Sequence, residues 1–184
     1  MWISWWGEIM GRAKEISISA ILIALSLALS YTERFIPLQI LIPLPGIKLG
    51  LANIVMLVAL YLLKTKYAVL ILIPRCVLGA VFGGGITGLL FSLWGGILAL
   101  STMAMMKRIP FFSIYGVSIL GAAAHNVGQI LAAMVLMHSV YIGAYLPYLL
   151  LIAVLTGFLT GSISAGILRA ILYAQIFVPS EMRR

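Results

Sequence analysis

Three hydrogen-bonding side chains, His125, Asn126 and Gln129, stand close together in an otherwise apolar stretch. His125 and Gln129 are four residues apart and share one face of a helix, and Asn126 is three residues from Gln129. Such groups are costly in hydrocarbon unless they meet a ligand, water or another helix. The pattern indicates either a binding surface or polar contacts between helices, and the spacing leaves both open.

Arg75 is a second candidate, because it follows Pro74 near the middle of an apolar segment over residues 67–82. A charge at the centre of a bilayer costs on the order of 3 kcal/mol on insertion scales. Such residues typically face a cavity or a partner and mark a functional site. The alternative is a structural ion pair with Glu33, the acid nearest to the outer half of the membrane.

Lys48 and Asn53 lie in the outer half of an expected helix over residues 47–63, and Glu33 and Arg34 end the helix before it. Cations and amide donors gathered on one side suit an anionic or carboxylate-bearing small molecule. Arg34 is better explained by extension of its side chain to the lipid headgroups. The expected substrate-binding residues are Glu33, Lys48, Asn53, Arg75, His125, Asn126 and Gln129.

Several kinds of chemistry lack the residues they need. The chain contains no aspartate and no Walker A motif, so neither a Ser-His-Asp set nor nucleotide hydrolysis by that motif can be built. His138 lies more than three helical turns from His125, which argues against a metal site. We therefore expect no catalytic residue, no metal, no cofactor and no enzymatic activity.

Membrane-spanning helices must position these residues. Hydrophobic residues make up 64% of the 184 residues and charged residues 9%, and the mean hydropathy is +1.19. Soluble domains are about a quarter charged, and a helix needs about 20 apolar residues to cross a bilayer. The sequence predicts an all-α integral membrane protein with one membrane domain and an interfacial segment over residues 1–14. About six helices are expected, over residues 16–33, 47–63, 67–82, 86–106, 114–138 and 147–173.

Basic residues are distributed unevenly between the expected loops. With an internal N-terminus, nine of the twelve fall on the cytoplasmic side, whereas the external loops hold Arg34 and Lys48. This bias follows the positive-inside rule and predicts that both termini are cytoplasmic in a bacterial-type cell membrane. It also accounts for the net charge of +8 without a nucleic-acid partner. The nine residues are Arg12, Lys14, Lys64, Lys66, Lys107, Arg108, Arg169, Arg183 and Arg184.

Small residues form a stripe in the first expected helix, where Ala20, Ala24 and Ala28 recur every four residues. Small side chains at this spacing allow another helix to approach closely. The stripe could serve a partner protein or internal packing, and the spacing alone does not decide between them.

Two further strings carry a family resemblance: Pro45-Gly-Ile-Lys-Leu-Gly-Leu-Ala-Asn53 and Gly121-Ala-Ala-Ala-His-Asn-Val-Gly-Gln129. With the alanine stripe and Arg75, they make the chain resemble the Gx transporter family, also described as heptaprenyl diphosphate synthase component I. That family in turn resembles the substrate-binding S-components of energy-coupling factor (ECF) transporters. Prenyl-diphosphate synthases use paired aspartates and magnesium, so the synthase reading does not fit this chain.

The resemblance implies a six-helix bundle that binds a vitamin-like small molecule from outside. It implies that Ala20, Ala24 and Ala28 dock on a transmembrane coupling protein driven by ATPase subunits, and that residues 35–46 gate the pocket. A membrane anchor or assembly subunit of a quinone- or redox-related complex is the alternative. In that case the polar residues would join helices and bind no substrate.

Overall fold

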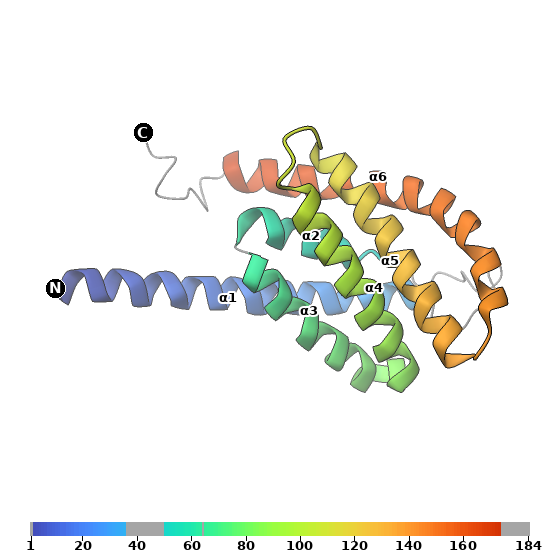
Figure 1. Cartoon of the computed structure of the whole chain (residues 1–184). Helices are drawn as coiled ribbons and strands as arrows, with labels where there is room; N and C mark the ends of the chain where they lie inside the picture. Colours follow the sequence, from blue (N-terminus) through green and yellow to red (C-terminus); the bar gives the residue numbers. More distant parts are fainter. Residues whose placement is uncertain (1, 36–49, 64, 174–184) are drawn as a thin grey trace.

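The computed structural model describes residues 2–35, 50–63 and 65–173, and this part of the chain is helical without a β-strand (Figure 1). Four apolar stretches of it are long enough to cross a membrane: Glu15–Thr32, Thr65–Met106, Ile114–Leu136 and Val140–Tyr173. The protein is therefore an all-α membrane protein. Its helices are α1 (Trp2–Thr32), α2 (Asn53–Leu62), α3 (Thr65–Gly79), α4 (Gly85–Met106), α5 (Ile114–Leu136) and α6 (Leu146–Tyr173), with short helical turns η1 (Glu33–Phe35), η3 (Ala80–Gly84) and η4 (Val140–Tyr145).

The α1 helix is longer than the sequence suggested. The expected interfacial segment over residues 1–14 and the helix after it form one element from Trp2 to Thr32. Residues 12–16, Arg-Ala-Lys-Glu-Ile, are mostly strong helix formers, so nothing interrupts the helix at the expected boundary. Figure 1 shows the N-terminal part of α1 extending beyond the other helices.

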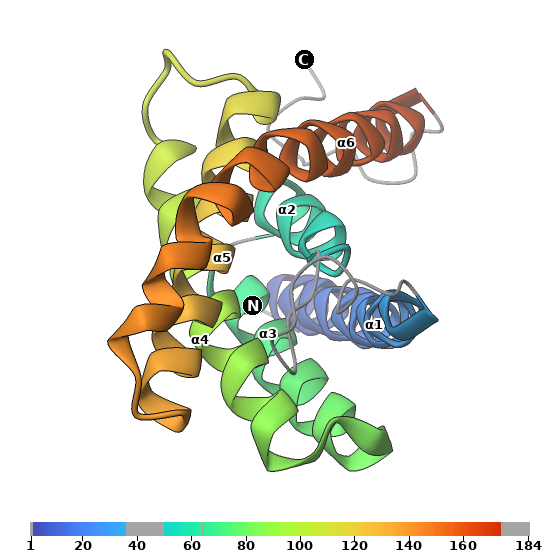
Figure 2. The same ribbon diagram turned by 90° about the vertical axis from the view of Figure 1, so that its right-hand side faces the viewer.

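The α2 helix lies at the centre of the bundle. It begins at Asn53 rather than near residue 47, after a turn in which Gly50 has a φ of 82° and its carbonyl accepts from the Asn53 N–H. Only glycine adopts this left-handed conformation readily. The first eight residues of α2 are all buried, and α2 contacts each of the other five helices (Figure 2). A helix buried on every side can be apolar all round, as this one is apart from Asn53.

The stretch Thr65–Met106 contains two helices joined by a reversal. The α3 helix passes through Pro74 and ends at Gly79, and the chain then turns through η3 before α4 begins at Gly85. Gly83 and Gly85 have φ values of 106° and 60°, which glycine tolerates without a Cβ clash. The glycine run expected to end the third helix thus makes a turn, and α4 runs back beside α3 (Figure 1).

Glycines allow α4, α5 and α6 to pack closely. A methyl group on Gly128 of α5 would lie 2.5 Å from the Trp94 carbonyl oxygen of α4, and one on Gly157 of α6 would lie 2.5 Å from Ile119 Cα of α5. These contacts are between backbones, which side-chain rotation cannot relieve. A 2.8 Å hydrogen bond between the hydroxyls of Ser118 and Thr160 also joins α5 to α6.

One end of the bundle gathers several helix termini. Figure 1 shows the C-terminal end of α2, the α4–α5 loop and the C-terminal end of α6 toward the same side as the N-terminal part of α1. At this end Lys107 donates a 2.6 Å hydrogen bond to the Leu60 carbonyl and lies 4.8 Å from the ring centroid of Tyr61. The partial burial of Lys107 lowers its pKa, because desolvation disfavours the charged amine. Lys107 thereby satisfies a carbonyl at the C-terminal end of α2.

Candidate functional site

Arg75 is buried at 5% exposure in the middle of the bundle. Its Nη1 lies 3.5 Å from Ser26 Oγ on α1, a long hydrogen bond to a neutral hydroxyl, and its Nε has no partner in the described residues. Glu33, proposed above as its ion-pair partner, accepts a hydrogen bond from the backbone N–H of Leu51. Because Ser26 and Glu33 are seven residues apart, roughly 10 Å separates them along the α1 axis. Arg75 and Glu33 therefore have different hydrogen-bond partners.

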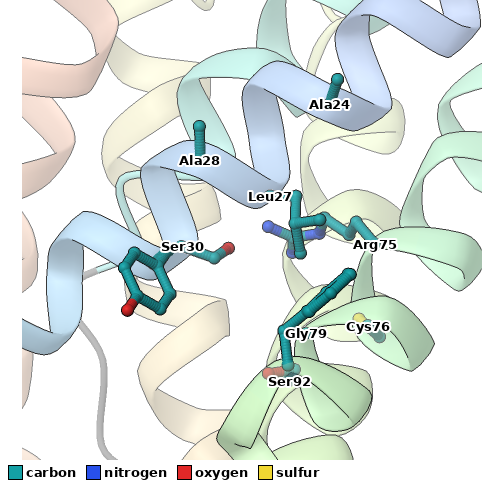
Figure 3. Close-up of a pocket in the computed structure, with 10 residues that line it drawn as sticks. Ala24, Leu27, Ala28, Ser30, Arg75, Cys76, Gly79 and Ser92 are labelled. Atoms are coloured by element: carbon teal, nitrogen blue, oxygen red, sulfur yellow. The ribbon is translucent and has the colours of Figure 1, made fainter.

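A cavity of about 580 Å³ lies beside Arg75, between the C-terminal half of α1 and the α3–α4 hairpin. Figure 3 shows the Arg75 side chain reaching from α3 toward α1. We call this space the Arg75 cavity. Its lining residues are Ala24, Leu27, Ala28, Ser30, Tyr31, Arg75, Cys76, Gly79, Phe82 and Ser92.

A second polar group lies around His125, which is 3% exposed. A methyl group on Gly95 of α4 would lie 2.8 Å from the imidazole, and one on Gly50 would lie 3.3 Å from it, so the ring is held between these two glycines. The same methyl on Gly50 would lie 2.8 Å from Asn53 Nδ2. His125 and Asn53 thus approach Gly50 from α5 and α2. Gly96, the next residue of α4, faces the Arg75 guanidinium. A methyl group on Gly96 would lie 3.3 Å from Arg75 Nη2.

Asn53 is the least satisfied polar side chain in this group. It is 6% exposed, and neither its Nδ2 nor its Oδ1 has a hydrogen-bond partner in the described residues. A buried polar group without a partner costs about 1–3 kcal/mol. Groups left in this state in a native structure are often completed by a ligand or water.

Asn126 has a different environment. Its Nδ2 donates a 2.8 Å hydrogen bond to the Leu149 carbonyl, which joins α5 to α6. This contact favours the interhelical role that the sequence left open for Asn126. Gln129 is fully buried one turn beyond His125. Lys48 and residues 36–46 of the expected lid lie outside the described residues.

The alanine stripe lies on the outward side of α1. Ala20, Ala24 and Ala28 are exposed, whereas Ser19 and Ser26 are buried on the opposite side. Figure 3 shows the methyl groups of Ala24 and Ala28 projecting away from Arg75. The stripe is therefore available for contact with lipid or with another protein, and Ala24 and Ala28 also line the Arg75 cavity.

Sequence reasoning missed the neutral residues that complete the site. Ser26 is a polar residue in an apolar helix and could have been noticed for that reason. Gly95 and Gly96 had no recognisable signal, because their importance lies in what packs against them. Cys76 is the single cysteine of the chain, and its place in the cavity follows from the packing of α3 on α1.

Comparison with known protein families places most of the chain in a described family. The family model described as heptaprenyl diphosphate synthase component I matches residues 22–167. This range includes Asn53, Arg75 and His125, and it begins just after Ala20. No curated protein and no solved structure matches the chain.

Proposed function

The chain belongs to the family described as heptaprenyl diphosphate synthase component I, and we propose that it is the substrate-binding component of an ECF-type importer. In this proposal it binds a small anionic molecule from the external side of the cell membrane. It delivers that molecule without chemical change, with the help of a transmembrane coupling protein and ATPase subunits. In this proposal the chain crosses the membrane at each of the six helices α1 to α6. An even number of crossings places both termini on the cytoplasmic side.

The observation that carries the proposal is Arg75 beside its cavity. A buried guanidinium whose Nε has no partner in the described residues, next to a space of about 580 Å³, supports ligand binding over helix packing. Pockets of about 300–1,000 Å³ are typical of small-molecule sites. Asn53 supports the same reading, because neither of its amide atoms has a hydrogen-bond partner in the described residues.

The competing function, a membrane anchor without a substrate, expects every buried polar group to join helices. Asn126 and Ser118 do so. Among the described residues, Asn53 makes no such bond, and Arg75 reaches Ser26 through Nη1. Some buried polar residues therefore join helices, whereas Asn53 and Arg75 keep hydrogen-bonding atoms that helix packing does not use. This difference favours substrate binding.

Replacement of Ala24 by tryptophan tests the proposed coupling. Affinity isolation of the tagged protein from native membranes is expected to bring down a second membrane protein together with ATPase subunits, and Ala24→Trp should abolish this. Ala20→Trp should act alike, and since Ala20 does not line the Arg75 cavity, its loss of partners cannot arise from the binding site. Mass spectrometry of the isolated complexes gives the readout.

Ala170→Trp is the matched control, because Ala170 is an exposed alanine on α6. It should isolate with the same partners as the unmodified protein. If the two α1 variants retain all partners, or if no ATPase accompanies the unmodified protein, the importer proposal fails.

The proposed orientation can be tested by cysteine labelling in intact cells. In a Cys76→Ala background, cysteines at Thr65 and Arg108 should resist a membrane-impermeant maleimide, because both positions lie at the end of the bundle that we place inside. Gly143→Cys in η4 should react, since η4 lies at the other end of α5 and α6. Labelling of Thr65→Cys or Arg108→Cys from outside would show that the orientation is the opposite of the proposed one.

A further inference from the structure

The positive charge of Arg75 has no carboxylate of the chain beside it among the described residues. The acidic residues of the chain are Glu8, Glu15, Glu33 and Glu181. Arg75 reaches α1 at Ser26, which is about 10 Å along the helix from Glu33 and about 16 Å from Glu15. Glu8 lies still further from Ser26 on the same helix, and Glu181 lies outside the described residues.

The two nearer acids are also engaged elsewhere. Glu33 accepts a hydrogen bond from Leu51, and Glu15 accepts one from the hydroxyl of Tyr67. A buried charge is strongly unfavourable when it lacks an opposite charge and hydrogen bonds. The charge of Arg75 is therefore suited to an anion that comes from outside the chain.

The space beside this charge is mainly apolar. Leu27 of α1, Gly79 of α3 and Phe82 of η3 line it, and Arg75 is its only charged lining residue in the described part of the chain. A fully polar ligand would leave hydrogen-bonding groups unmatched against this surface. A ligand with one acidic group and an apolar body would match both parts.

We propose that the Arg75 cavity binds an anionic amphiphile, with a carboxylate or phosphate group at Arg75 and an apolar body along Leu27, Gly79 and Phe82. The inference rests on the proposed function, because it names the substrate class of the same importer. A guanidinium donates parallel hydrogen bonds to either acidic group, so the two are distinguished by experiment.

The test uses the full chain in a nonionic detergent with four probes of one chain length: octanoate, octyl phosphate, octanol and octylamine. Cys76 is the only cysteine of the chain and lines the cavity next to Arg75, so its alkylation by N-ethylmaleimide reports occupancy. One or both anionic probes should slow alkylation several-fold and raise the thermal unfolding midpoint. Octanol and octylamine should do neither.

Three variants separate the two halves of the site. Arg75→Gln should weaken the apparent affinity for the anionic probes by about ten- to hundredfold, the range for a lost charge-assisted hydrogen bond. Arg75→Lys should also lose affinity, because a point charge cannot reproduce the guanidinium fork. Gly79→Leu should block the apolar body while Arg75 stays in place, since a Cβ there meets only Leu27 Cδ1, at 3.9 Å.

Arg169→Gln is the matched control, because Arg169 is exposed on α6 and lies outside the cavity. It should respond to the probes like the unmodified protein, and partitioning of the probes into micelles is common to all variants. Thermal shifts are measured for each variant against its own probe-free sample, so a change in basal stability does not obscure binding.

Equal protection by all four probes, or an unchanged response in Arg75→Gln, overturns the inference. If the anionic probes do not bind but the protein still isolates with its ATPase partners, the inferred substrate class is wrong and the importer proposal is retained. If octanoate or octyl phosphate binds through Arg75 but no ATPase partner is found, the binding site is retained and the transport proposal is wrong.

Discussion

Asn53→Leu is expected to stabilise the ligand-free protein while abolishing its retention of a bound small molecule. Both amide atoms of Asn53 are buried without a partner in the described residues, so leucine, which has the same branching at Cγ, removes a desolvation cost of about 1–3 kcal/mol. The gain should raise the thermal unfolding midpoint, followed by circular dichroism of the helices on heating. Mass spectrometry of molecules released from the purified protein measures retention.

Asn126→Leu provides the matched comparison, because the two asparagines are buried to a similar degree, at 6% and 4% exposure. Asn126 donates a hydrogen bond to the Leu149 carbonyl, so its loss should destabilise the protein by about 1 kcal/mol. The two substitutions should therefore have opposite signs. A destabilising Asn53→Leu with normal ligand retention would show that Asn53 supports the fold instead of the site.

Gly128→Ala is expected to destabilise the protein by about 3 kcal/mol, the upper end for overpacking. Its Cβ would lie 2.5 Å from the Trp94 carbonyl oxygen and 2.8 Å from Gly95 Cα. Only separation of α4 from α5 relieves this clash, and Gly95 is also the residue that packs against His125. We expect a fall of several degrees in the unfolding midpoint, together with weaker ligand retention.

Gly166→Ala on α6 is the control for the helix propensity of alanine. No heavy atom of the surrounding described residues lies within 4 Å of its Cβ position, so this change should be neutral or should stabilise by up to about 1 kcal/mol. If Gly128→Ala behaves like Gly166→Ala, then α4 and α5 do not approach as closely as described.

The sequence by itself determined the class of the protein and most of its helices. The apolar stretches predict α4, α5 and α6 to within a few residues of their observed bounds, because proline, glycine and basic residues mark their ends. It also determined that Arg75 needs an explanation, since a charge in an apolar helix is costly wherever the helix packs.

Only the tertiary structure decided which polar residues are satisfied. Asn53 and Asn126 look alike in the sequence, and they differ because Asn126 lies beside the Leu149 carbonyl of α6, whereas Asn53 has no partner among the described residues. The pairing of Arg75 with Glu33 seemed open because the sequence does not give the depth at which α3 meets α1. The contact with Ser26 fixes that depth.

The cavity and the outward face of the alanine stripe were likewise undecided until the helices were placed. A spacing of four residues aligns Ala20, Ala24 and Ala28 on one side of α1, but it does not say which side faces the bundle. Burial of Ser19 and Ser26 decides this, because the opposite side of a helix is then left exposed. Local spacing fixes the relative direction of side chains, whereas their environment depends on helices distant in the sequence.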